Sequence, residues 1–513
     1  MKRKHVKSAI LGVSAFFFLW GSFGAQADQP EAPVKTVHVY CDKILGPSQV
    51  GRALWFGGDM IYWGDTDDES LIKHVLQPWK ALQPEGVALD TALREWLHIT
   101  RNEKGVLEID FKEYDKKMAK TLRLLSVKPE NVLLCFEVPK ELSSWQTDNY
   151  FDAMPKDMEE WKWFVEQVIR HNLQKNWKVQ NYGVAGEPDC CTEAAGSWKM
   201  NFPKHVKLYA ATCQAAGKAD PTVKIWTPGT MNWQGTKYTQ GSPTLGEWIR
   251  ELARYNARVS PQQKVKLTRL GWQDYAWSSD KISDGKEAVK AMLAKNGFQA
   301  TEFGLAPSGW GSWCSDYLDE TLPPHRRASY VVSNVIREFK TPQPDIGLMS
   351  YYTFRADPCL GEEGDSDASL FRVAAVTSNC FDPEGQTSLT PIYAGFEAVA
   401  KLRDGQIIDT DASATGLETM AVINKDGLPV VILNNHGPEP IKIKLEVHGV
   451  PFQSGKVNHV IQRIDERHSR GGKKGLEDGV WLGPLPCAET VEVLETVDPY
   501  GTVVETFWPD YSP

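Results

Sequence analysis

Between residues 36 and 402, short apolar runs alternate with segments in which apolar residues recur every three or four positions. The first pattern is typical of β-strands and the second of amphipathic helices. We expect strands at 36–40, 54–59, 92–97, 132–139, 179–184, 223–227, 267–275, 299–304 and 346–354. The expected helices are 71–82, 111–125, 158–172, 204–217, 245–255, 287–296, 324–339 and 392–402. About eight strand-then-helix units predict an α/β fold, the (β/α)8 TIM barrel.

An open, doubly wound sheet is the alternative architecture for the same alternation of strands and helices. Such sheets often carry the motif G-x-G-x-x-G after their first strand, and this chain does not. From about Gly405 the pattern changes to short strands separated by turn residues, at 420–423, 430–434, 441–447, 457–464 and 491–495. Closely spaced strands of this kind predict an antiparallel β-sandwich. We therefore expect a catalytic barrel over 28–404 and a β-sandwich domain over 405–513.

The first 27 residues have the three parts of a secretory signal peptide. Four basic residues precede an apolar run over 9–20, and Ala25-Gln26-Ala27 offers a small-x-small cleavage site. No stretch approaches the roughly 20 apolar residues that a membrane-spanning helix needs, although an uncleaved anchor is the alternative. The net charge of −9 gives no basic footprint for nucleic acid or anionic lipid. We expect a secreted or periplasmic protein that has no nucleic-acid partner and no membrane span.

Nine cysteines and 19 tryptophans stand out in the composition. In an oxidising compartment some cysteines should pair, and Cys359 with Cys380, or Cys190 or Cys191 with Cys213, would close short loops. No Cys/His cluster has zinc spacing, so we expect no structural metal. Tryptophan rings suit stacking on sugar C–H faces, with plain core packing as the competing interpretation.

Two glutamates lie where the expected strands give way to loops. Glu187 lies between Gly186 and Pro188 after the fourth barrel strand, and we expect Glu302 to end the seventh, beside Gly304. Functional groups of such barrels lie at the carboxyl ends of the strands. Two carboxylates at one mouth, one protonated and one ionised, are what glycosidic bond cleavage requires. Two unrelated surface acids are the alternative interpretation.

Several segments support this hypothesis together and in order. They are Leu93-Arg94 followed by Trp96, Asp110-Phe111 through Tyr114-Asp115, 136–142, 301–304, 350–354 with Asp357, and 464–469. In these segments the chain resembles the retaining glycoside hydrolases of clan A. Within that clan it is most similar to family 39, which includes β-xylosidases and α-L-iduronidases.

The resemblance implies a role for each matching residue. Glu187 would be the general acid/base and Glu302 the nucleophile, and Arg94 and Tyr275 would hold the nucleophile ionised. The expected substrate-binding residues also include Asp59, Trp96, Trp272, Trp277, Trp310, Trp313 and Tyr352. The mechanism implied is double displacement on a carbohydrate substrate, with no metal or organic cofactor.

One position departs from the clan pattern, which usually has Asn directly before the acid/base. Here Ala185 and Gly186 precede Glu187. Contacts to the sugar 2-hydroxyl that strengthen in the transition state normally supply several kcal/mol. Another group can supply that contact, the sugar can be substituted at that carbon, or activity has been lost. The alternative function is therefore a catalytically inactive carbohydrate-binding protein on the same barrel.

Overall fold

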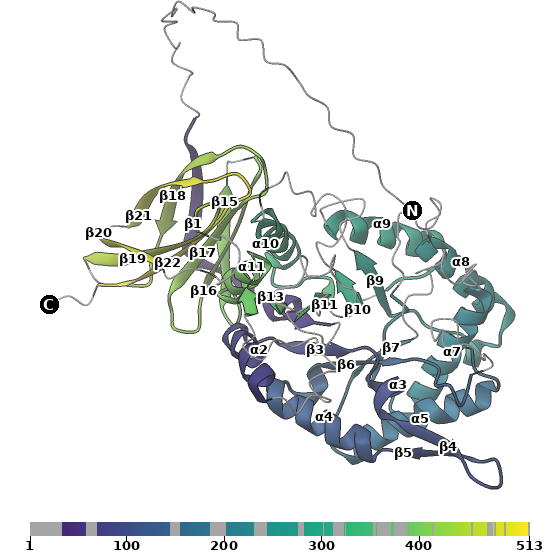
Figure 1. Cartoon of the computed structure of the whole chain (residues 1–513). Helices are drawn as coiled ribbons and strands as arrows, with labels where there is room; N and C mark the ends of the chain where they lie inside the picture. Colours follow the sequence, from purple (N-terminus) through teal and green to yellow (C-terminus); the bar gives the residue numbers. More distant parts are fainter. Residues whose placement is uncertain are drawn as a thin grey trace, which may run out of the picture.

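The computed structural model describes residues 33–57, 69–143, 154–184, 202–229, 244–274, 282–300, 302–310, 323, 325–351, 355–356, 371–373, 387–389, 391–412, 415–452, 455–468, 476, 479–486 and 489–510. A barrel of strands ringed by helices lies beside a sheet-rich domain (Figure 1). The expected signal peptide and the cysteine pair Cys359 and Cys380 lie outside the described residues. No helix in the described ranges is both long and apolar enough to cross a membrane.

Eight parallel strands form the barrel sheet, in the order β8-β7-β6-β3-β2-β11-β10-β9. The last strand pairs with the first, with Tyr351 opposite Phe56. At the remaining join, between β8 and β9, the Thr227 hydroxyl donates to the Gly271 carbonyl and accepts from its N–H, both at 2.8 Å. The (β/α)8 prediction is thereby confirmed. The strands are β2 (Trp55–Phe56), β3 (Gly86–Leu89), β6 (Val132–Phe136), β7 (Asn181–Val184), β8 (Lys224–Ile225), β9 (Arg269–Asp274), β10 (Glu302–Trp310) and β11 (Ile346–Tyr351).

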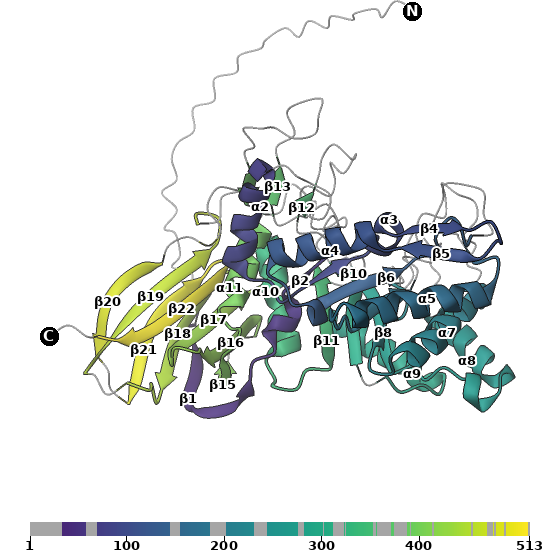
Figure 2. The ribbon, with the colours of Figure 1, turned by 90° about the horizontal axis from the view of Figure 1, so that it is seen from below.

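The helices form the outer layer of the barrel (Figures 1 and 2). They are α2 (Glu69–Leu82), α3 (Ala92–Trp96), α4 (Lys112–Leu125), α5 (Met158–Gln174), α7 (Phe202–Ala219), α8 (Thr244–Arg258), α9 (Ile282–Lys295), α10 (Arg326–Phe339) and α11 (Pro391–Ala400). Short 3-10 turns lie at η1 (Val50–Ala53), η3 (Pro129–Asn131) and η6 (Pro261–Gln263). Smaller strands are β4 (His98–Arg101), β5 (Leu107–Asp110), β12 (Arg355–Ala356), β13 (Phe371–Val373) and β14 (Thr387–Leu389).

The strand predicted at 92–97 is wrong, because this segment forms helix α3. The second barrel strand is instead β3, just upstream. In α3 the buried residues are Ala92, Leu93 and Trp96. Their positions i, i+1 and i+4 share one face of a helix, whereas a strand would alternate sides at each residue. The run of six residues is too short for the spacing of its apolar positions to distinguish a helix from a strand.

Nine strands form the second sheet, in the order β20-β19-β22-β17-β16-β15-β1-β18-β21. All of its pairs are antiparallel except β1 with β18. Strand β1 comes from the region predicted as barrel, so the domain division changes there: the β-domain takes one of its strands from ahead of the barrel. The strands are β1 (Lys35–Pro47), β15 (Gln406–Ala412), β16 (Leu417–Ile423), β17 (Pro429–Asn435), β18 (Ile441–His448), β19 (Lys456–Ile464), β20 (Val480–Pro486), β21 (Thr490–Val497) and β22 (Thr502–Pro509).

Helix α10 joins the barrel to the β-domain through a buried polar contact. The Ser329 hydroxyl lies 3.1 Å from the Asn434 side-chain oxygen and 3.0 Å from Nδ1 of His436. Asn434 in turn donates to the Ser329 carbonyl at 3.2 Å. Because buried polar groups are costly unless paired, these reciprocal bonds favour one fixed arrangement of the two parts.

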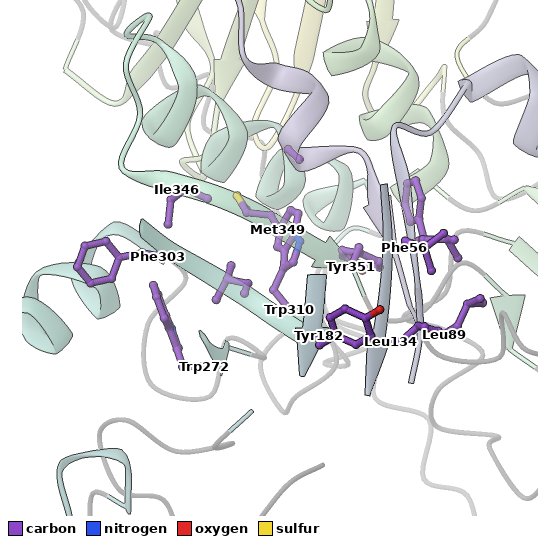
Figure 3. Close-up of a cluster of buried hydrophobic side chains, with 14 of the residues drawn as sticks. Phe56, Leu89, Leu134, Tyr182, Trp272, Phe303, Trp310, Ile346, Met349 and Tyr351 are labelled. Atoms are coloured by element: carbon purple, nitrogen blue, oxygen red, sulfur yellow. The ribbon is translucent and has the colours of Figure 1, made fainter. Parts of the chain in front are cut away.

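The barrel strands bury two different sets of side chains. Outward-facing aromatics such as Tyr182, Trp272 and Trp310 pack in the large core that contains the surrounding helices (Figure 3). A separate cluster fills the barrel interior and contains Trp55, Ala88, Leu133, Cys135, Trp226 and Leu348. This packed layer separates the two ends of the barrel, so each end has its own chemistry.

Candidate active site

The carboxyl-terminal mouth of the barrel carries a buried glutamate, Glu137, directly after β6. Leu133 and Cys135 point into the barrel interior, and strand alternation places Glu137 on the same side. Only 6% of Glu137 is exposed. Asp90 follows β3 at the same rim, and the Cys135 thiol donates to its Oδ1 at 3.9 Å. Two carboxylates from neighbouring strands therefore lie at the end of the barrel where substrates bind in this fold.

Arg94 on α3 is the cationic partner of Glu137. Its Nη1 lies 2.9 Å from Glu137 Oε2, and its Nη2 lies 2.8 Å from Glu95 Oε1. Burial raises the pKa of Glu137 to about 7, against the opposing effect of Arg94 and with smaller raising effects from Asp90 and Glu95. Glu137 therefore changes its protonation state near neutral pH, as carboxyl groups used in acid–base and nucleophilic chemistry often do.

The segment that contains Glu187 begins beside this cluster. Strand β7 ends at Val184, which pairs with Phe136, the residue before Glu137. Neighbouring strands lie about 4.8 Å apart, so the chain leaves β7 next to Glu137. Glu187 follows Val184 by three residues and lies outside the described residues. Its role as acid/base stays a prediction.

The predicted position of Glu302 is wrong. We expected it to end the seventh strand, but it is the first residue of β10. It pairs with Arg269, which begins β9, while the opposite end of β10, Trp310, pairs with Asp274. The five steps from Arg269 to Asp274 place Glu302 on the order of 16 Å from the mouth at about 3.3 Å per residue. From there it does not reach a sugar bound at the mouth.

Glu302 is instead the centre of an ion cluster at the amino-terminal end of the barrel. Its Oε1 accepts from Lys224 Nζ at 3.0 Å, and its Oε2 accepts from Arg269 Nε at 2.8 Å. The three residues begin β10, β8 and β9, respectively. Gly347 makes room for the carboxylate, because a Cβ there would lie 2.2 Å from Glu302 Oε1. This arrangement ties three strand starts together and indicates a structural role.

The described tryptophans predicted as substrate contacts belong to the core. Trp96, Trp272 and Trp310 are each 1% exposed or less. Trp96 packs near Tyr114, Trp272 against Phe303, and Trp310 against Tyr351 and Phe396. For these three the sugar-platform prediction is wrong and core packing is right. The other predicted contacts lie outside the described residues: Asp59, Tyr275, Trp277, Trp313 and Tyr352.

Arg94 lies at the mouth, as the resemblance implied, but its carboxylate partner is Glu137 rather than Glu302. The sequence offered a signal for Glu137, a glutamate that directly follows five apolar residues and precedes Pro139 by two positions. Glu187 likewise follows an apolar run and precedes a proline, but it was singled out by the glycine directly before it, which Glu137 lacks. Cys213, one of the cysteines considered for a short disulfide-closed loop, is a free thiol.

Solved structures share this architecture over most of the chain. A GH39 enzyme from Xanthomonas axonopodis pv. citri matches with a TM-score of 0.67 and 13% identity, over 95% of this chain and 100% of that one. A monomeric β-xylosidase from Caulobacter crescentus CB15 matches with 0.65 and 12%, over 93% and 100%. A glucosidase from Croceicoccus marinus matches with 0.64 and 15%, over 94% and 100%.

No family model and no curated protein sequence matches the chain. At such low sequence identities the structural matches show the fold alone, and the function is inferred from the residues of the site. The chain is thus similar in fold to glycosidases that include GH39 enzymes, with a (β/α)8 barrel and an accompanying β-domain.

Proposed function

We propose that the protein is a retaining glycoside hydrolase that cleaves an oligo- or polysaccharide at the carboxyl-terminal mouth of its barrel. The observation that carries the proposal is Glu137, a buried carboxylate beside Arg94 with a pKa near 7, at the rim from which β7 leads towards Glu187. The fold is also that of enzymes described as a glucosidase and a β-xylosidase. The amino-terminal pattern supports export of the enzyme.

In the proposed mechanism Glu187 keeps its predicted role as acid/base, and Glu137 replaces Glu302 as the nucleophile. Ionised Glu137 attacks the anomeric carbon, the glycosidic bond breaks, and Glu187 protonates the leaving oxygen. The sugar is then held as an ester on Glu137. Glu187 next removes a proton from water, the water attacks the anomeric carbon, and the ester bond to Glu137 breaks. Two inversions give a product with retained configuration.

Arg94 has a defined role in these steps. A guanidinium 2.9 Å from Glu137 stabilises the ionised carboxylate against the effect of burial. With a pKa of about 7, Glu137 is mostly ionised only above neutral pH. We therefore expect kcat/KM to increase as the pH rises through about 7. At higher pH, deprotonation of the general acid Glu187 should lower kcat/KM again.

The test is a hydrolysis screen over a glycan panel, with the anomer of the first-formed product followed by NMR. We expect release of a sugar with retained configuration, and no such release by Glu137→Gln. The matched control is Glu302→Gln, which removes a carboxylate from the other end of the barrel and should keep hydrolysis. A first product of inverted configuration contradicts the retaining mechanism. Glycan binding without hydrolysis by the wild-type protein supports the alternative of a carbohydrate-binding protein.

A further inference from the structure

A second cluster of functional side chains lies on the β-domain, where β18 is flanked by β1 and β21 (Figure 1). In the parallel pairing of β1 with β18, His38 lies opposite Glu446 and Tyr40 lies opposite His448. In the antiparallel pairing of β18 with β21, His448 lies opposite Thr490. The intervening residues, including Val39 and Val447, belong to the domain core. Strand alternation therefore places the histidines and Glu446 together on the opposite, outer face.

Three ligand atoms from this face converge on one point. His38 Nδ1 lies 3.2 Å from His448 Nε2 and 3.0 Å from Glu446 Oε2. His448 Nε2 lies 3.8 Å from the same Glu446 oxygen. A tetrahedral zinc ion with bonds of about 2.0–2.1 Å separates its ligand atoms by about 3.3 Å. The three measured separations scatter closely around that value, so the side chains already form one triangular face of such a tetrahedron.

The surrounding contacts orient these side chains. The Nδ1 atom of His448 lies 2.9 Å from the Thr490 hydroxyl. When this nitrogen carries the proton, the lone pair of Nε2 faces His38, as a metal ligand requires. Lys444 lies 2.8 Å from Oε1 of Glu446 and 2.9 Å from Glu492, which leaves Oε2 directed at the histidines.

The charges around the cluster permit a cation. Lys43 pairs with Asp409 at 3.7 Å, and Asp411 lies opposite His38 in the pairing of β1 with β15. Together with Lys444, Glu446 and Glu492, these groups comprise four carboxylates and two lysines, so negative charge is in excess. The three ligand side chains remain partly exposed, at 33% for His38, 17% for Glu446 and 27% for His448. An ion can therefore enter from solvent and keep a water as its fourth ligand.

We propose that His38, Glu446 and His448 form a binding site for a divalent cation of the zinc class. Two imidazoles and one carboxylate suit Zn²⁺, whereas Mg²⁺ and Ca²⁺ prefer oxygen ligands throughout. The ion would join β1, which precedes the barrel, to β18, which follows it. It would therefore stabilise the pairing of these two strands in the β-domain sheet. The site lies on the β-domain rather than at the barrel mouth, and the proposal does not depend on the glycosidase activity.

The competing explanation is a hydrogen-bonded cluster in which Nδ1 of His38 donates its proton to Glu446 and His448 without any metal. The two explanations differ in a titration of the full-length protein, first treated with EDTA and then titrated calorimetrically with ZnCl₂. The metal site predicts one ion bound per chain with a micromolar or tighter Kd. His38→Ala and His448→Ala should each weaken binding at least tenfold. The matched control is His98→Ala, an exposed histidine on the barrel hairpin, which should leave binding unchanged.

Thermal unfolding gives a second readout that separates a lost site from a damaged fold. Zn²⁺ should raise the Tm of the wild-type protein and of His98→Ala, and leave the Tm of the double variant His38→Ala/His448→Ala unchanged. Mg²⁺ should have no effect on any of them. Zinc binding of equal affinity in the double variant would overturn the proposal, because the ion would then sit elsewhere. Absence of zinc binding by the wild-type protein would overturn it as well.

Discussion

The two ends of the barrel each hold a glutamate on the inner side of the strands, but the two carboxylates have different partners. At the amino-terminal end Glu302 binds Lys224 and Arg269, one cation at each oxygen. At the mouth Glu137 contacts Arg94, which also binds Glu95. A carboxylate held between two cations is suited to fastening strands together. Glu137 is buried and shares Arg94 with Glu95, so its pKa lies near 7 and the carboxyl group is suited to acid–base or nucleophilic chemistry.

The largest effect should come from removing the carboxylate at the mouth. Glu137→Gln keeps the shape of the side chain but cannot attack the anomeric carbon, so kcat should fall roughly 10³-fold or more. Steady-state kinetics on the best substrate of the glycan panel measures this loss. Glu141→Gln, at an exposed glutamate on the same loop, is the matched control and should retain activity. Equal losses in both variants would indicate a general disturbance of the loop.

The same variant should also change how stability depends on pH. Burial raises the pKa of Glu137 from 4.5 to about 7, so the wild-type fold is favoured below pH 4.5 and loses stability as the pH rises to about 7. Glu137→Gln has no carboxyl proton to lose, so its free energy of unfolding should not show this decrease. The difference in free energy of unfolding between the variant and the wild type should therefore shift in favour of the variant by up to about 3 kcal/mol between pH 4.5 and 8, at about 1.4 kcal/mol per pKa unit. Urea denaturation at both pH values measures the difference. A gap that does not change with pH would show that Glu137 is not the buried acid described above.

Removing the carboxylate at the other end should affect stability rather than chemistry. Glu302→Gln leaves Lys224 and Arg269 without their anion, and we expect the free energy of unfolding to fall by about 1–3 kcal/mol. The kcat per folded molecule should stay within about threefold of the wild type. Denaturant titration and active-site-normalised kinetics measure the two quantities. A large loss of kcat with unchanged stability would reverse the roles assigned to the two ends.

The remaining prediction concerns the packed layer between the two ends of the barrel. Gly304 gives room to the indole of Trp226, since a Cβ at Gly304 would lie 2.5 Å from its Cζ3. We expect Gly304→Ala to lower the free energy of unfolding by about 1–3 kcal/mol through overpacking. In Gly217→Ala on α7, the added Cβ meets no atom within 4 Å. That control should stabilise the helix by roughly 0.5–1 kcal/mol, and thermal unfolding of both variants measures the contrast.

The alternation of apolar runs and helical periods predicted the barrel correctly, because each unit is encoded locally. The end of a strand is encoded less locally, and this explains the error at Glu302. We took Gly304 as the end of the strand, but β10 continues to Trp310. The glycine is there because Trp226, 78 positions upstream, fills the space beside it. Nothing within 299–304 reveals that contact.

Long-range pairing limited the other predictions in the same way. The strand containing His38 was expected, but its partners β15 and β18 lie more than 350 residues away. Spacing rules for metal sites therefore missed a cluster whose histidines are 410 residues apart. The core roles of Trp272 and Trp310 depend on which face of their strands meets the helices. Which face of each strand packs on the helices can be predicted only when the strand register is known.

In the proposed mechanism both catalytic carboxylates belong to the mouth of the barrel, and Glu302 is not one of them. The most direct measurement uses fluorinated glycosides that trap the glycosyl-enzyme ester, tried over several sugars, followed by peptide mapping of the labelled residue by mass spectrometry. We expect the label on the peptide that contains Glu137, and none after Glu137→Gln. A label on the peptide that contains Glu302 would contradict the assignment of the two ends.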